Sequence, residues 1–153
     1  MEIPAVTGAA SSPAAVRLFG NWLSMWNDDP QIALQIIAAD LRTHLPRVGM
    51  PPPGQVHDPV TMAAWVTAFR SSFESGTFRP LIGPLGVDDL LFCHWEFTGV
   101  WRGGRPPTAT ARPGTLVDFR GVDVLRVRDD RVTEYWLTDN QLDLYAQIGA
   151  FRG

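Results

Sequence analysis

The spacing of apolar residues changes from helical to strand-like about halfway along the chain. Three segments have apolar residues at helical spacing after a Ser or Asp followed by Pro, a helix-start signal: residues 13–27, 30–39 and 59–73. Residues 40–45 alternate in polarity and predict a short strand or an extended exit from the second helix. From Phe78 onward the period is two, which predicts four strands: 78–85, 90–101, 119–128 and 132–139. A short helix over 141–149 closes the chain.

Helices followed by antiparallel strands predict an α+β fold. We expect three N-terminal helices to pack on one face of a strongly curved, mostly antiparallel sheet, with a pocket between the two layers. At 153 residues and 45% apolar content, the chain is long enough to bury one core. The predicted organisation is a flexible N-terminus over residues 1–11 and a single domain over residues 12–153.

Two aspartates fall on the apolar face of the predicted C-terminal hairpin. Odd positions of its first strand are mostly apolar and include Asp123, whereas the even positions carry arginines. A three-residue turn over 129–131 pairs Arg128 with Val132, so odd positions face odd positions and Asp139 joins Asp123 on one side. A two-residue turn would break this match. Carboxylates in apolar surroundings pair, hydrate or have a raised pKa, and two in different surroundings provide an acid and a base. The alternative is that each caps a turn or pairs with an arginine.

Composition excludes several classes of partner and chemistry. The formal charge of −3 and the pI near 5.5 argue against nucleic acid or an anionic membrane as the main partner. All 13 basic residues are arginine, so Schiff-base and other lysine chemistry is excluded. Cys93 is the only cysteine, which fits a reducing compartment. Neither a signal peptide nor a membrane span of about 18 apolar residues is visible, and we expect a cytoplasmic protein.

Motifs and single residues narrow the candidates further. The three histidines lack ligand spacing, which argues against a metal site, and the glycine motifs of serine hydrolases, NTPases and dinucleotide enzymes do not occur. His44 ends the alternating stretch after the second helix and is a candidate proton shuttle, or else an ordinary hydrogen-bonded histidine. The chain has six tryptophans. Trp22, Trp26, Trp65 and Trp101 are candidates to line a cavity for a flat ligand, with core packing as the alternative for each.

Several segments together resemble the SnoaL-like polyketide cyclases of the NTF2-like superfamily: FRGVDVLRVRDDRVTEYW, DNQLDLYAQIGA, HWEFTGVWRG and WNDDPQIALQIIAADLRTHLP. The resemblance implies a cone-shaped α+β domain, usually dimeric, that binds an apolar ring system without a metal or organic cofactor. It also implies an aspartate that catalyses intramolecular aldol closure of a polyketide ester. The family's catalytic Asp follows the Trp of Glu-x-Trp, where this chain has Leu137. Asp139, two residues on and on the same face, is the candidate replacement, and Asp123 matches a pocket position.

The first hypothesis is therefore a cofactor-independent acid/base enzyme of secondary metabolism, active as a homodimer on a small, apolar, oxygenated substrate of polyketide type. Its candidate catalytic residues are Asp123, Asp139 and His44. Its candidate substrate-binding residues are Trp22, Trp26, Trp65, Trp101, Phe119, Tyr135, Leu137 and Arg42.

Two alternatives stay open. Limonene-type epoxide hydrolases of the same superfamily use an Asp-Arg-Asp trio to place a water against an epoxide, and Asp123, Asp139 and Arg42 would form a similar trio. A third activity of the superfamily is disfavoured. Ketosteroid isomerases resemble the segment AADLRTHLP, but their proton-abstracting Asp would fall near Leu45, which argues against isomerase activity. A non-catalytic module that binds a small ligand is the second alternative, motivated by Leu137 at the catalytic position.

Overall fold

The computed structural model describes residues 12–151, so the predicted flexible segment 1–11 lies outside the described residues. The elements in chain order are α1 (Pro13–Asn27), the 3₁₀ helix η1 (Pro30–Ile32), α2 (Ala33–Ile36), β1 (Ile37–His44), α3 (Pro59–Arg70), β2 (Phe73–Val87), β3 (Leu90–Trp101), β4 (Leu116–Arg128), β5 (Arg131–Asp139) and α4 (Gln141–Gln147).

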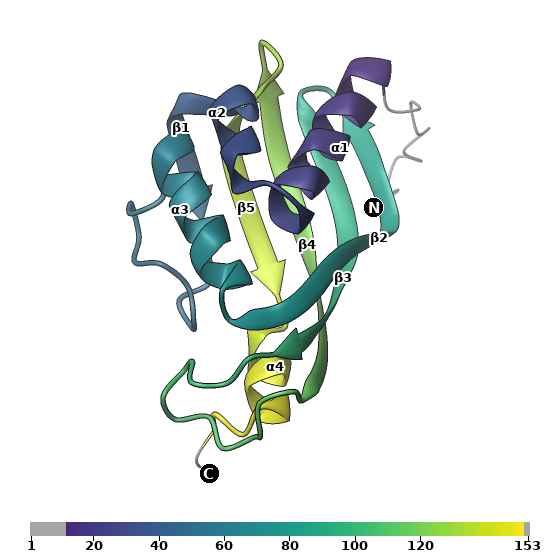
Figure 1. Cartoon of the computed structure of the whole chain (residues 1–153). Coiled ribbons are helices and arrows are strands. Elements are labelled where there is room, and N and C mark those ends of the chain that lie inside the picture. The colour runs from purple at the N-terminus through teal and green to yellow at the C-terminus, as the bar shows by residue number, and fades with distance from the viewer. Residues whose placement is uncertain (1–11, 152–153) are drawn as a thin grey trace, which may run out of the picture.

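The N-terminal helices lie on one face of a five-stranded sheet (Figure 1). The strand order is β1-β5-β4-β3-β2; β1 runs parallel to β5, and the other neighbours are antiparallel. Helix α4 lies at the end of the molecule near the C-terminus (Figure 1). The predicted α+β class is confirmed, whereas the strong curvature stays a prediction. None of the helices in the described range is long and apolar enough to cross a bilayer.

Each N-terminal helical segment begins where its capping residue predicts. Ser12 accepts a hydrogen bond from the backbone N–H of Ala15 at 3.2 Å, and Asp29 starts η1 in the same way. Asp58 forms a capping box with Thr61, whose backbone N–H donates to it at 2.8 Å. A proline follows each of the three capping residues, where its missing N–H costs no hydrogen bond.

The second helical segment is shorter than predicted. Helical spacing favours a helix to residue 39, but α2 ends at Ile36 and Ile37 already has extended dihedrals of −98° and 133°. The reason is tertiary, because β1 starts at Ile37 by pairing with Val132 of β5. A strand partner more than 90 residues away in sequence overrides the local preference for helix.

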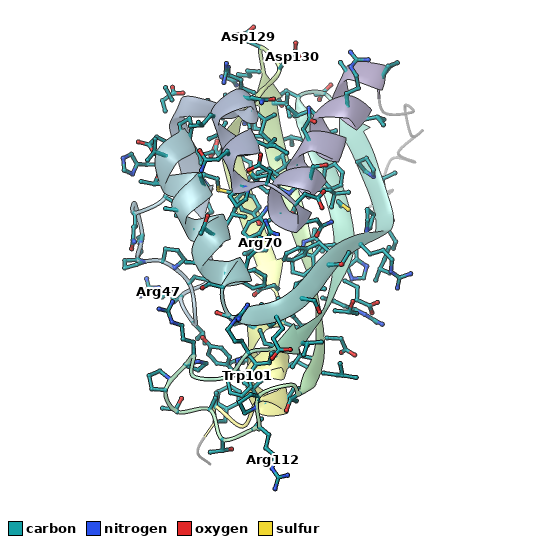
Figure 2. All side chains as sticks on the ribbon, in the orientation of Figure 1. Arg47, Arg70, Trp101, Arg112, Asp129 and Asp130 are labelled. Atoms are coloured by element: carbon teal, nitrogen blue, oxygen red, sulfur yellow. The ribbon has the colours of Figure 1, made fainter. Side chains whose placement is uncertain are left out.

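The predicted turn between β4 and β5 is wrong by one residue. Arg128 pairs directly with Arg131, so the turn has two central residues, Asp129 and Asp130. Their φ values of 51° and 57° are those of a type I′ turn, in which Asp tolerates the left-handed region. Figure 2 shows both aspartates at the tip of the hairpin. Taken alone, this turn would bring odd positions opposite even ones.

A β-bulge restores the register that the turn breaks. The pairing shifts by one next to Arg126 and leaves Thr133 as an extra residue on β5. Beyond the bulge odd positions face odd positions again, and Asp123 pairs with Leu137. Asp139, two residues after Leu137, therefore lies on the same face of the sheet as Asp123.

Phenylalanines fill much of the space between the helices and the sheet. Phe97 of β3 lies at their centre, and the rings of Phe69, Phe73, Phe78 and Phe119 lie 4.8–5.5 Å from its own. Edge-on and tilted ring pairs of this kind add packing energy beyond the burial of their area. This cluster forms one side of the cavity described next.

Candidate active site

A cavity between α1, α3 and the sheet contains both candidate carboxylates. Most of its wall is aromatic, formed by Trp22, Trp26, Trp65, Phe69, Phe78, Trp95, Phe119 and Tyr135. Leu23, Met50 and Leu137 add apolar surface, and the polar side chains are Asp123, Asp139 and Gln141. The cavity volume is about 50 Å³. That is room for a few water molecules, and less than the roughly 150 Å³ that admits benzene.

Asp123 is buried at the centre of this wall, with 5% of its surface exposed. The indole N–H of Trp22 donates to Oδ2 at 2.9 Å, and the Tyr135 hydroxyl donates to Oδ1 at 2.7 Å. Burial raises the pKa of Asp123 to about 6, and the hydrogen bonds from Tyr135 and Trp22 oppose this rise because they favour the charged form. The nearby Trp95 indole lowers the same pKa more weakly. The carboxyl therefore titrates close to neutral pH instead of near 4.

In its hydrogen bond with Asp123, Tyr135 is an uncharged donor. Burial raises its pKa well above 10, and the negative charge of Asp123 raises it further. Its ring also packs edge-on against Trp22 at 4.8 Å between centroids. Because the phenol keeps its proton over the physiological range, it holds the Asp123 carboxylate in one orientation.

One carboxylate oxygen of Asp139, Oδ1, is buried, and no side chain or backbone group in residues 12–151 forms a hydrogen bond with it. Burial raises the pKa of Asp139 to about 6; the backbone N–H of Gln141 opposes the rise, and the charge of Asp123 adds to it. Asp139 thus combines a contact at the start of α4 with a free acceptor in the cavity wall. Of the two carboxylates, it is the one better placed to meet a ligand.

Gly121 provides the space that Asp139 occupies. It pairs with Asp139 across the β4–β5 ladder and with Trp95 across the β3–β4 ladder. A Cβ atom at position 121 would clash with the Trp95 ring and lie 2.9 Å from Cβ of Asp139. A glycine in the middle of a strand is here required by the close approach of two side chains.

Unpaired buried polar atoms are concentrated in this wall. Four such side-chain atoms occur in the described part of the chain, and all four belong to wall residues: Trp26 Nε1, Trp95 Nε1, Asp139 Oδ1 and Gln141 Oε1. Trp95 Nε1 lies near enough to Asp123 to lower its pKa, but no acceptor meets hydrogen-bond geometry. Buried polar groups without partners are costly and rare, so their concentration indicates a place for water or a polar ligand.

Arginines do not neutralise the two carboxylates. Arg120 pairs instead with Glu96 at 3.0 Å on the face of the sheet away from the helices, and Arg126 pairs with Asp89 of the β2–β3 turn at 2.9 Å. Among the residues that the structure describes, neither Asp123 nor Asp139 forms an ion pair with an arginine, so that alternative is wrong. The turn-capping alternative does apply to Asp139, which accepts a hydrogen bond from the backbone N–H of Gln141 two residues later.

His44 and Arg42, predicted as site residues, do not line the cavity. The parallel pairing of β1 with β5 places Arg42 opposite Glu134 and His44 opposite Trp136. These even positions of β5 face away from the helices. His44 is exposed, stacks on Trp136 at 5.1 Å and lies 3.0 Å from the Glu134 carboxylate. The Asp-Arg-Asp trio is therefore not formed. His44 instead lines a second, more open pocket that also includes Leu137 and Asp139, and its role as a proton shuttle stays a prediction.

Trp101 is buried but also lies outside the cavity. It comes six residues after Trp95 on β3, a separation of roughly 20 Å at strand spacing. Its indole N–H donates to the Arg105 carbonyl at 3.0 Å. Figure 2 shows Trp101 beside α4, far from the hairpin tip. Its inward face follows from the strand period, whereas its distance from the carboxylates depends on the length and pairing of β3.

The other predicted site residues do lie in the cavity wall: Trp22, Trp26, Trp65, Phe119, Asp123, Tyr135, Leu137 and Asp139. Sequence reasoning missed Trp95 and Gln141. Extending the odd-to-odd register from β4 to β3 would have found Trp95. No local pattern indicates Gln141, because its place depends on how α4 folds back, with the Gln147 side chain bonded to the backbone of Asp118.

Metal-binding groups do not gather here. Within residues 12–151, no cluster of three His, Cys, Asp or Glu side chains is arranged to hold a metal ion. The expected absence of a metal and of an organic cofactor stays a prediction.

Comparison with known proteins relates the chain to one family by sequence and to several solved structures by fold. Residues 19–135 match the family model described as SnoaL-like domain. No curated protein matches the chain significantly. A proposed polyketide cyclase from Acidithiobacillus ferrooxidans is 22% identical, with a TM-score of 0.77 over 92% of this chain and 96% of that one. IdmH from Streptomyces antibioticus, also a proposed polyketide cyclase, is 20% identical, with a TM-score of 0.74 over 90% and 99%. TsrD from Streptomyces laurentii is 17% identical, with a TM-score of 0.75 over 94% and 100%. At these identities, the solved structures show a shared fold.

Proposed function

The chain belongs to the SnoaL-like domain family of the NTF2-like superfamily, and on this premise we propose that it is a cofactor-independent acid/base enzyme. Its substrate would be a small, apolar, oxygenated molecule of polyketide type, and its reaction an aldol or related ring closure. The observation that carries the proposal is the unpartnered, buried Oδ1 of Asp139 beside a second buried carboxylate in an aromatic cavity. The predicted homodimer and cytoplasmic location stay predictions.

Asp139 is the proposed base and Asp123 the carboxylate that tunes it. Asp139 Oδ1 would take a proton from the carbon next to a substrate carbonyl, and that carbon would attack a second carbonyl of the same molecule. One C–H bond breaks, one C–C bond forms, and Asp139 returns the proton to the new alkoxide oxygen. A base whose pKa lies near 6 suits this double role, because it both accepts and releases a proton near neutral pH.

Asp123 contributes through its charge and its hydrogen bonds. Its negative charge raises the pKa of Asp139, and Trp22 and Tyr135 hold its own carboxylate in place. The charge state of Asp123 therefore influences how readily Asp139 takes up a proton. Near pH 6 the site offers one acid and one base.

The wall has to open before a ring fits. A cavity of about 50 Å³ is too small for one. The wall residues Gly49 and Met50 belong to the stretch between β1 and α3, where regular structure is absent. We propose that movement of this stretch admits the substrate, because a loop yields more readily than packed helices or paired strands.

Proton abstraction can be tested before the natural substrate is known. In deuterated buffer, the protein should accelerate exchange of the protons next to the carbonyl of cyclohexanone, measured by NMR. Asp139→Asn should lower the catalysed rate at least about 100-fold, the lower range for a positioned acid or base. Asp118→Asn, at an exposed position of β4, is the matched control and should leave the rate unchanged.

The pH dependence gives a second readout of the same assignment. The exchange rate should rise with pH through about 6, because Asp139 acts as a base only after it loses its proton. An unchanged rate in Asp139→Asn would refute the assignment and favour the non-catalytic binding module. The epoxide-opening alternative loses its support, since Arg42 lies outside the cavity and no arginine appears among the described wall residues.

A further inference from the structure

Trp26 and Gln141 have no part in the proposed proton transfer, yet both place unpaired polar atoms in the cavity wall. Each side chain belongs to a residue that is only 8% exposed, and within residues 12–151 neither Trp26 Nε1 nor Gln141 Oε1 has a hydrogen-bond partner. The two come from different elements, α1 and α4. Trp26 is surrounded by the aromatic rings of the wall, and Gln141 lies in the same wall next to Asp139.

The hydrogen-bonding character of the two groups differs. An indole N–H only donates, so Trp26 requires an acceptor such as a carbonyl oxygen. The Gln141 amide has an acceptor and two donors, and its orientation is interchangeable, so a hydroxyl group satisfies it in either orientation. The free Asp139 oxygen also accepts a bond from a hydroxyl. A ligand that satisfies this wall therefore carries a carbonyl-type oxygen and a hydroxyl on one apolar body.

Charge and shape restrict the ligand further. The wall contains two carboxylates and no basic side chain in the described residues, so an anionic ligand would be repelled. A small ammonium cation would be attracted by the carboxylates, but it would leave the indole N–H of Trp26 unpaired. The aromatic surfaces favour a ring as the apolar body.

Building on the proposed function, we propose that the cavity selects an uncharged cyclic hydroxyketone, and that Trp26 and Gln141 are its specificity-determining residues. Trp26 binds the carbonyl-type oxygen, and Gln141, beside Asp139, binds the hydroxyl. This arrangement specifies two polar groups of the substrate; the ring closure proposed above requires a second carbonyl on the same molecule, and the catalytic role stays with Asp139.

Matched single-ring probes test the proposal directly. The probes are 4-hydroxycyclohexanone, cyclohexanone, which lacks the hydroxyl, and cyclohexanol, which lacks the carbonyl; dissociation constants come from ligand-observed NMR titration. The wild-type protein should bind the hydroxyketone roughly threefold to tenfold more tightly than either single-function ring, the range for one net hydrogen bond. Trp26→Phe should abolish the advantage due to the carbonyl, and Gln141→Leu the advantage due to the hydroxyl.

Controls separate recognition from folding. Trp136→Phe, on the opposite face of the sheet, should keep both advantages. Gln141→Leu should melt at or above the wild-type temperature, because it removes a buried amide oxygen that has no partner among the described residues. If a variant removes both advantages or neither, or if cyclohexylammonium binds more tightly than the hydroxyketone, the proposal is wrong.

The outcome is distinct from that of the proton-exchange experiment. Selective binding of the hydroxyketone without proton exchange would leave this proposal standing and refute the enzymatic role. Exchange of cyclohexanone protons, with no tighter binding of the hydroxyketone than of cyclohexanone, would support the enzymatic role and refute this proposal.

Discussion

Replacing Tyr135 by Phe should destabilise the protein more at pH 8 than at pH 5. The Tyr135 hydroxyl donates to the Asp123 carboxylate at 2.7 Å, inside a buried site. A hydrogen bond to a charged group contributes about 1.5–3 kcal/mol, against about 0.5–1.5 kcal/mol for a neutral pair. We expect a loss of about 2 kcal/mol at pH 8, where Asp123 is ionised, and about 1 kcal/mol at pH 5, where it is protonated.

The direction of this pH dependence follows from the pKa of Asp123. In the folded protein that pKa is about 6, against 3.8 for an unperturbed group. The folded state therefore binds the proton more tightly, and its contribution to stability is present at low pH and lost as pH rises through 6. A pKa difference of about two corresponds to roughly 3 kcal/mol of folding stability, which is lost as the pH rises from the ordinary pKa of 3.8 to the folded-state pKa of about 6. Without the Tyr135 donor the pKa rises further, so the variant continues to lose stability above pH 6.

The assay is urea denaturation of the wild type, Tyr135→Phe and the control Tyr145→Phe at pH 5, 6, 7 and 8. The free energies of unfolding are extrapolated to water. Tyr145→Phe is the matched control. Tyr145 packs against Phe151 at 6.1 Å, and its hydroxyl forms no side-chain hydrogen bond with the residues that the structure describes. Its effect should be small and independent of pH. Equal losses for Tyr135→Phe at pH 5 and pH 8 would refute the reasoning, since the hydrogen bond would then not distinguish the two charge states of Asp123.

Two further predictions test the packing around the site. Gly121→Ala should cost about 1–3 kcal/mol in thermal or urea denaturation, because the added methyl group meets the Trp95 ring and Asp139; Gly20→Ala, where nothing lies within 4 Å, should instead stabilise α1 by about 0.5–1 kcal/mol. Cys93 should react with a thiol reagent at pH 8 only in denaturant, because it is buried and burial raises its pKa to about 12. Rapid labelling of the native protein would show that the core around β3 opens.

Local signals in the sequence determined where the N-terminal helices begin and which strand residues face the core. Ser12, Asp29 and Asp58 each precede a proline, and each starts a helical segment. The period of two placed Asp123 among apolar neighbours, and it is buried. Such features depend on residues a few positions apart, so spacing and capping chemistry contain them in full.

Only the tertiary structure decided which side chains meet. The bulge at Thr133 restored a register that the turn alone would have lost, and the pairing of β1 beside β5 turned His44 away from the cavity. Trp22 and Asp123, joined by a 2.9 Å hydrogen bond, lie 101 residues apart in the sequence. Strand order, bulges and helix docking depend on the total packing of distant segments, and the free energy of that packing is not encoded in the spacing of any one of them.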